Sequence, residues 1–126
     1  MDHPELYILR HGQTEWNAED RMQGWLNSPL TPQGLREAAH QYDIMRQRDL
    51  TGFQVLSSPS GRAFQTAAIA LGSLVDTIHT DLRLREIDVG DWSGRLRADL
   101  PKADGPDAYL KQYEAAPNGE GLAGLR

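Results

Sequence analysis

The stretch ELYILRHG at residues 5–12 decides the fold class. It begins as a short apolar run rich in strand-forming residues and ends on an arginine, a histidine and a glycine. We interpret residues 5–10 as a buried strand that leads into a loop. Two further runs, at residues 53–56 and 77–80, predict short strands of the same kind.

Amphipathic helical segments alternate with these predicted strands. Thr31-Pro32 is typical of a helix start, and the apolar spacing predicts a helix from there to about Arg48. A second helix should begin near Ser60, and a third is predicted over residues 106–114. The residues expected on the buried faces of the first two helices are Leu35, Ala38, Ala39, Tyr42 and Met45, and Phe64, Ala67, Ala68, Leu71 and Val75. Strands and helices that alternate in this way predict an α/β fold with a mostly parallel sheet.

The bulk properties limit the classes of function. A chain of 126 residues is long enough for one domain, so residues 1–126 are expected to form a single unit. The formal net charge of -5 argues against nucleic acid or an anionic membrane as the main partner. There is no cysteine, which excludes disulfides and thiolate metal sites. With neither a signal-peptide pattern nor a long apolar run, we expect a cytoplasmic protein.

Polar residues gather where the first two predicted strands end, at residues 10–12 and 57–62. Open parallel sheets bind ligands at the carboxyl ends of their strands. A neutral imidazole such as that of His11 is a nucleophile for a phosphoryl group when its other nitrogen is held as a donor. Arg10 can fork onto two phosphate oxygens. For an isolated Arg-His-Gly tripeptide, the alternative is a histidine that only caps a strand end.

Arg62 and Glu86, beyond the second and third predicted strands, are further candidates, as are Asn17 and Gln23 in the loop after the first. Arg62 is near a helix start, where a phosphate would meet a guanidinium and unbonded backbone N–H groups, although a solvated surface arginine is the alternative. Glu86 could protonate a leaving oxygen if partial burial raised its pKa, although loop carboxylates are mostly solvated. Asn17 and Gln23 could bind substrate oxygens or close turns.

Four ordered groups of residues then cover nearly the whole chain. They are Leu9–Asn17 (LRHGQTEWN); Gln23-Gly24-Trp25 with Ser28-Pro29-Leu30-Thr31 and Gly34; Ser57-Ser58-Pro59 with Arg62 and Gln65-Thr66-Ala67; and Glu86 with Gly90, Trp92 and Gly94. Pro117, Gly119 and Glu120 extend the match. Together they resemble the histidine phosphatase superfamily, also called phosphoglycerate mutase-like. The resemblance implies a three-layer α/β/α fold with a mostly parallel sheet.

The resemblance also implies roles. His11 would be transiently phosphorylated, Arg10 and Arg62 would hold the phosphoryl group, and Glu86 would be the acid for the leaving group. The residues implied to line the substrate side are Asn17, Gln23 and Gly24. Cationic clamps stabilise the charge on a transferred phosphoryl group, so neither a metal nor another cofactor is expected. The implied partner is a small phosphorylated substrate.

One family feature has no counterpart in this chain. The family uses a second histidine, on a later strand that lies between the first and second strands. The remaining histidines, His3, His40 and His79, cannot be assigned to that role. We therefore expect a gap in the sheet with unpaired backbone. Either residues 1–126 are the N-terminal portion of a longer domain, or two short chains exchange strands in a homodimer. The first is favoured, because residues 121–126 resemble a helix cut short.

The residues after Glu86 favour one branch of the family. The mutase branch has a Tyr-Gly pair there, whereas this chain has Ile87-Asp88. The prediction is a phosphomonoester hydrolase that works through phosphohistidine at His11, with mutase-type phosphoryl transfer as the second choice. Arg95 and Arg97 could bind the second anion that a mutase needs. A non-catalytic phosphate-binding module is the remaining alternative.

Overall fold

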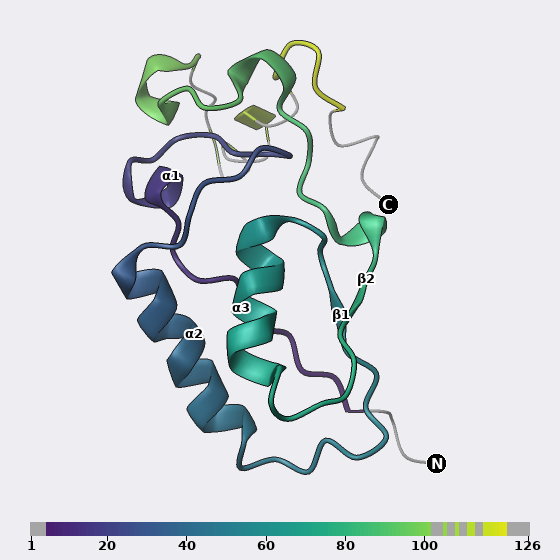
Figure 1. The fold of residues 1–126 in the computed structure, drawn as a ribbon. Helices are drawn as coiled ribbons and strands as arrows, with labels where there is room; N and C mark the ends of the chain where they lie inside the picture. The colour runs from purple at the N-terminus through teal and green to yellow at the C-terminus, as the bar shows by residue number, and fades with distance from the viewer. Residues whose placement is uncertain (1–4, 102–104, 106–107, 109–110, 113–114, 121–126) are drawn as a thin grey trace.

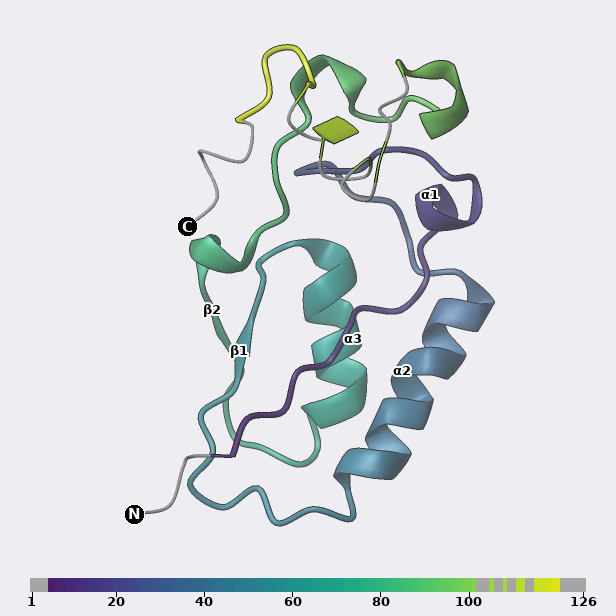
Figure 2. The same cartoon turned by 180° about the vertical axis from the view of Figure 1, so that it is seen from behind.

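The computed structural model describes residues 5–101, 105, 108, 111–112 and 115–120. The helices and strands are α1 (Glu15–Ala18), α2 (Pro32–Met45), β1 (Leu56–Ser57), α3 (Gly61–Leu71) and β2 (His79–Thr80), followed by three 3-10 turns at Leu82–Leu84, Gly90–Trp92 and Arg97–Asp99. In both ribbon views α3 lies between α2 and the two strands (Figures 1 and 2). None of the described helices is long and apolar enough to cross a membrane.

The two strands pair in parallel, as the sequence predicts. Leu56 is opposite His79 and Ser57 is opposite Thr80, with α3 as the connection between the strands. The backbone N–H of His79 donates to the carbonyl of Val55 at 3.0 Å, which extends the pairing by one residue. A strand, a helix and a parallel strand in succession confirm the predicted α/β class.

Both long helices begin close to where the sequence predicts. The Thr31 hydroxyl accepts a hydrogen bond from the N–H of Gly34 at 3.0 Å, and Pro32 occupies the first turn. Of the apolar residues expected on the buried faces, the buried ones are Ala38, Met45 and Leu71, while the exposed ones are Leu35, Ala39, Phe64 and Ala68. The buried face of α3 instead includes Arg62 and Thr66, because polar partners from other segments satisfy these side chains.

The prediction of a strand at residues 5–10 is wrong for this structure. The segment has no strand assignment, and Leu6 and Ile8 are 78% and 86% exposed. Tyr7 and Leu9 face the other way and pack on a core cluster that contains Met45. The alternation of exposed and core-facing side chains is that of a strand. No described strand lies beside this segment to accept its hydrogen bonds. Figure 2 shows the segment, in purple, crossing in front of α3.

A large cavity separates residues 5–11 from β1. Its volume is about 980 Å³, and its lining includes Leu6 and Ile8 from one side and Leu56 from the other. The cavity lies where the sequence predicts a gap in the sheet. The unpaired backbone of residues 5–10 therefore borders one side of the cavity.

A second core cluster holds the loop after β2 in place. The cluster consists of Met22, Ile87, Val89, Trp92, Leu100 and Ala116. Met22 also exchanges backbone hydrogen bonds with this loop, donating to the carbonyl of Arg95 at 3.0 Å and accepting from Gly94 at 2.7 Å. The helix predicted over residues 106–114 falls largely outside the described residues, and the prediction for residues 121–126 falls wholly outside them.

Two glycines allow the loop after residue 11 to touch α2. A Cβ atom on Gly34 would lie 2.1 Å from the carbonyl oxygen of Gln13, and one on Gly12 would lie 2.3 Å from the carbonyl oxygen of Gly34. These are backbone contacts, which cannot move aside as a flexible side chain can. Gly12 and Gly34 therefore fix the separation between the loop and the first turn of α2.

Replacing Gly34 with alanine tests this close contact. We expect Gly34→Ala to lower the free energy of unfolding by about 1–3 kcal/mol through overpacking, even though alanine is the better helix former. Urea unfolding followed by circular dichroism measures the change. Gln33→Ala, an exposed change in the same turn, should stay within about 0.5 kcal/mol of the wild type. Equal midpoints for Gly34→Ala and the wild type would contradict the overpacking argument.

Candidate active site

The four predicted catalytic residues line the same cavity, the 980 Å³ cavity beside β1. Arg10 and His11 come from the segment before α1, Arg62 from the first turn of α3, and Glu86 from the loop after β2. The charges of Arg62, Arg10 and Glu86 all act on the His11 imidazole. The structure thus brings together residues that are far apart in the sequence.

A backbone carbonyl fixes the orientation of the His11 ring. The Nδ1 atom lies 2.7 Å from the carbonyl oxygen of Gly12. A carbonyl oxygen can only accept a hydrogen bond, so Nδ1 carries the hydrogen in the neutral ring and Nε2 keeps a lone pair. This tautomer is the one that nucleophilic attack through Nε2 needs.

The surroundings of His11 favour its neutral form. Burial lowers the pKa of His11 below its ordinary value, and the positive charges of Arg62 and Arg10 lower it further. The Gly12 carbonyl and the Glu86 carboxylate act in the opposite direction without reversing the shift. At neutral pH the imidazole is therefore unprotonated at Nε2 and able to attack an electrophile.

A buried threonine connects the histidine loop to Arg62. The backbone N–H of Gly12 donates to the Thr66 hydroxyl at 3.0 Å, and that hydroxyl donates to the carbonyl of Arg62 at 2.7 Å. Thr66 is only 3% exposed. No role was predicted for Thr66, although a hydroxyl one turn after Arg62 on the same helix face was the signal available in the sequence.

Three polar groups from the loop before α2 hold Arg62. Its Nη1 donates to the carbonyl of Leu26 at 2.8 Å and its Nη2 to the carbonyl of Gly24 at 2.9 Å. Its backbone N–H donates to the side chain of Asn27 at 3.0 Å. Of the backbone N–H groups expected to be unbonded at this helix start, that of Arg62 is therefore already occupied by Asn27.

The three residues predicted to line the substrate side have structural partners. Asn17 closes the first turn of α1, because its side chain accepts from the N–H of Thr14 at 3.0 Å. Gln23 is 6% exposed and accepts from the Ser28 hydroxyl at 3.1 Å. Gly24 presents its carbonyl to Arg62. Gln23 and Gly24 are absent from the lining of the 980 Å³ cavity, whereas Asn17 lines a neighbouring pocket.

Glu86 lies at the open edge of the cavity. The residue is exposed, so the expected partial burial is wrong. Its Oε1 accepts a hydrogen bond from the N–H of Ile87 at 2.8 Å, and its backbone carbonyl accepts one from the indole of Trp25 at 2.8 Å. The Glu86 backbone is therefore anchored although its carboxylate faces solvent.

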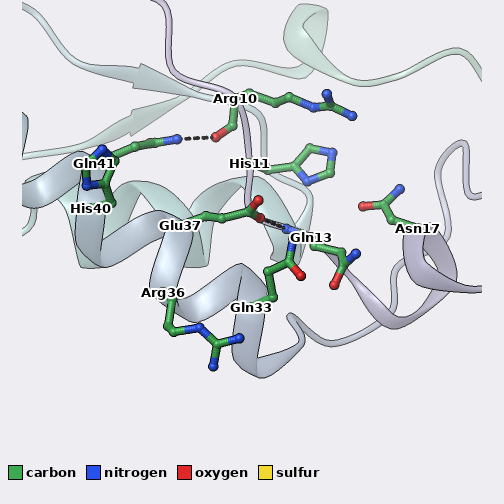
Figure 3. A pocket seen from close by; sticks show the side chains of 9 residues that line it. All are labelled: Arg10, His11, Gln13, Asn17, Gln33, Arg36, Glu37, His40 and Gln41. Atoms are coloured by element: carbon green, nitrogen blue, oxygen red, sulfur yellow. Dashed lines mark hydrogen bonds between the residues drawn. The ribbon is translucent and has the colours of Figure 1, made fainter.

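The neighbouring pocket lies against α2 and has a volume of about 660 Å³. Figure 3 shows the residues that line it, which are Arg10, His11, Gln13, Asn17, Gln33, Arg36, Glu37, His40 and Gln41. Gln41 donates to the carbonyl of Arg10 at 2.8 Å, and Glu37 accepts from the N–H of Gln13 at 2.8 Å. The histidine loop is thus held by α2 on one side and by Thr66 on the other.

Neither of the other described histidines is placed beside the His11 ring. In Figure 3 the side chain of His40 lies at the end of the pocket away from His11. His79 is exposed in β2 and absent from the cavity lining, and His3 falls outside the described residues. Among the residues that the structure describes, no group of three or more His, Asp or Glu side chains could hold a metal ion.

Comparison with known proteins identifies the family of the chain. The family model of the histidine phosphatase superfamily (branch 1) matches residues 6–126. "Probable phosphoglycerate mutase GpmB" of Proteus mirabilis is 41% identical over 96 residues, which cover 76% of this chain and 44% of that protein. The chain therefore spans less than half the length of that curated relative.

Solved structures give the same result. A mycobacterial glucosyl-3-phosphoglycerate phosphatase in complex with VO3 is 35% identical, with a TM-score of 0.72, over 88% of this chain and 56% of that chain. A phosphoglycerate mutase from Thermus thermophilus is 30% identical, with a TM-score of 0.74, over 92% of this chain and 63% of that chain. The chain belongs to the histidine phosphatase superfamily, a family of enzymes. Both matches have the α/β fold that the sequence predicts.

The pKa of His11 offers a direct test of the electrostatics. In an NMR titration His11 should titrate below the ordinary histidine value, and Arg10→Gln should raise its pKa. The sign follows because the substitution removes a positive charge that disfavours the imidazolium. Arg36→Gln provides the control, since Arg36 is not among the charges that shift the pKa of His11, although it lines a pocket that His11 also lines. Equal shifts from the two substitutions would rule out a specific effect of Arg10.

Proposed function

We propose that this chain carries the nucleophile and the phosphate clamp of a phosphomonoester hydrolase that acts through phosphohistidine at His11. The main support is the His11 ring, which the Gly12 carbonyl holds with Nε2 unprotonated, in a cavity that Arg10, Arg62 and Glu86 also line. The substrate is a small phosphorylated molecule. Since the chain spans only part of its relatives, the activity is a proposal for the whole protein.

The reaction follows from the placement of the groups. The His11 Nε2 attacks phosphorus, the ester P–O bond breaks, and protonated Glu86 gives its proton to the leaving oxygen. A water molecule then attacks the phosphohistidine, giving a proton to the Glu86 carboxylate while the N–P bond breaks. Arg10 and Arg62 stabilise the charge on the transferred oxygens in both steps.

Hydrolysis is favoured over the mutase reaction. A mutase must hold a second anion, and the sequence offered Arg95 and Arg97 for that purpose. Neither lines the cavity, and Arg97 is engaged with Asp20 at 3.3 Å and Gln112 at 2.8 Å. Ile87-Asp88 also follows Glu86 in place of the Tyr-Gly pair of the mutase branch. The assignment to the phosphatase branch rests on these two observations.

A phosphate-binding module is the second candidate. His11 is the only histidine among the described residues that line the 980 Å³ cavity. Arginine clamps can bind phosphate without a second histidine, whereas turnover makes further demands on the site. Under this alternative, the chain binds inorganic phosphate but does not turn over an ester.

Labelling of His11 distinguishes these functions. Brief incubation with a ³²P-labelled phosphomonoester, followed by an alkaline quench that preserves phosphohistidine, should leave label on the wild-type chain. His11→Ala should lose essentially all of the label, and His79→Ala, an exposed change in β2, should keep it. Equal labelling of His11→Ala and the wild type would exclude the proposed nucleophile.

The module alternative has its own measurement. Calorimetric titration with inorganic phosphate, paired with an assay of p-nitrophenyl phosphate hydrolysis, separates binding from turnover. Binding that Arg10→Ala weakens, together with no hydrolysis and no label, would support the module. Hydrolysis that depends on His11 would reject it.

A further inference from the structure

A single short loop, residues 24–27, contacts both halves of the candidate site. On one side its carbonyls and the Asn27 side chain make three hydrogen bonds with Arg62, at 2.8, 2.9 and 3.0 Å. On the other side the Trp25 indole donates to the carbonyl of Glu86 at 2.8 Å. The loop therefore links the predicted phosphate clamp to the predicted acid.

A second contact holds the Trp25 ring in place, on the face of the ring. The guanidinium of Arg85 lies 3.8 Å from the ring centroid, within the range of a cation–π contact. Trp25 is 42% exposed, so core packing alone does not account for a tryptophan at this position. Its ring and its N–H both contact residues 85–86, in the loop that carries the carboxylate.

Gly24 strengthens the link next to Trp25. Its φ angle is +54°, and a Cβ atom there would lie 2.9 Å from the carbonyl oxygen of Ile87. The backbone of the loop thus lies against the residue that follows Glu86. A displacement of residues 24–27 would move both the carbonyls around Arg62 and the support of Glu86.

We infer that Trp25 is a positioning residue, whose indole N–H sets the Glu86 backbone at a fixed place relative to Arg62. This inference rests on the proposed function, since it assumes that Glu86 protonates the leaving oxygen. The Glu86 side chain is exposed, so few packing contacts limit its direction. Besides the hydrogen bond that its Oε1 accepts from the N–H of Ile87, its anchored backbone supplies that restraint.

The expected effect depends on the leaving group. An alkyl phosphate needs a proton on its leaving oxygen, whereas 2,4-dinitrophenyl phosphate expels a stable anion without one. Trp25→Phe keeps an aromatic ring for Arg85 but removes the indole N–H together with part of the ring system. The ratio of kcat/KM for the dinitrophenyl ester to kcat/KM for an alkyl ester should rise about tenfold, a fraction of the 10²–10⁴ that general acids supply.

Three further variants make the result specific. Trp16→Phe removes an indole that lies beside Gly94, whereas the N–H that donates to Glu86 belongs to Trp25, so this substitution should leave the ratio at the wild-type value. Glu86→Gln should raise the ratio more than Trp25→Phe does. Trp25→Phe in the Glu86→Gln background should then add no further change, because the two substitutions act on one proton transfer.

The outcomes separate the inference from the proposed function. Hydrolysis of both esters by the wild type, with an unchanged ratio in Trp25→Phe, would overturn the role of Trp25 alone. Hydrolysis of neither ester would overturn the proposed function. In that case NMR decides the structural link: the amide signals of Glu86 and Ile87 should shift in Trp25→Phe and stay in place in Trp16→Phe. No shift in either variant would overturn the anchoring as well.

Discussion

The buried hydrogen bonds of the Thr66 hydroxyl hold the candidate site together. They join Gly12 to Thr66, 54 positions further along the sequence, and through Thr66 to the carbonyl of Arg62. One such bond contributes only about 1 kcal/mol net, but a buried group left without its partner costs about 1–3 kcal/mol. The loop that carries His11 can therefore leave α3 only if buried polar atoms lose their partners, which is why His11 and Arg62 share one cavity.

A second constraint acts from the side of α2. The backbone contact between Gly12–Gln13 and Gly34 brings the histidine loop against the helix, and the side chains of Glu37 and Gln41 hold it there. Side-chain bonds can adjust to small movements, whereas contact between two backbones cannot. The position of the His11 ring is thus set by packing of the main chain, and its tautomer by the Gly12 carbonyl.

Local signals made part of this structure predictable. The Thr31-Pro32 start of α2 and the place of α3 depend on neighbouring residues and were predicted correctly. The parallel pairing of β1 with β2 was predicted from the alternation of strand and helix patterns. The sharing of one cavity by His11, Arg62 and Glu86 was predicted from the family resemblance rather than from spacing. The exposure of Leu35 and Phe64 and the bond from Arg62 N–H to Asn27 were missed, because each depends on a distant segment.

The segment at residues 5–10 shows how far tertiary context decides secondary structure. Its alternation is that of a strand, and Tyr7 and Leu9 reach the core as strand residues would. Leu6 and Ile8 nevertheless stay exposed, because a strand needs a neighbour as well as a pattern. The contacts that position His11 and Arg62 come from α2, α3 and residues 24–27, away from the unpaired edge of this segment. The contacts that hold His11 and Arg62 therefore do not depend on what fills the cavity, whereas the approach of any group to His11 from the cavity side does.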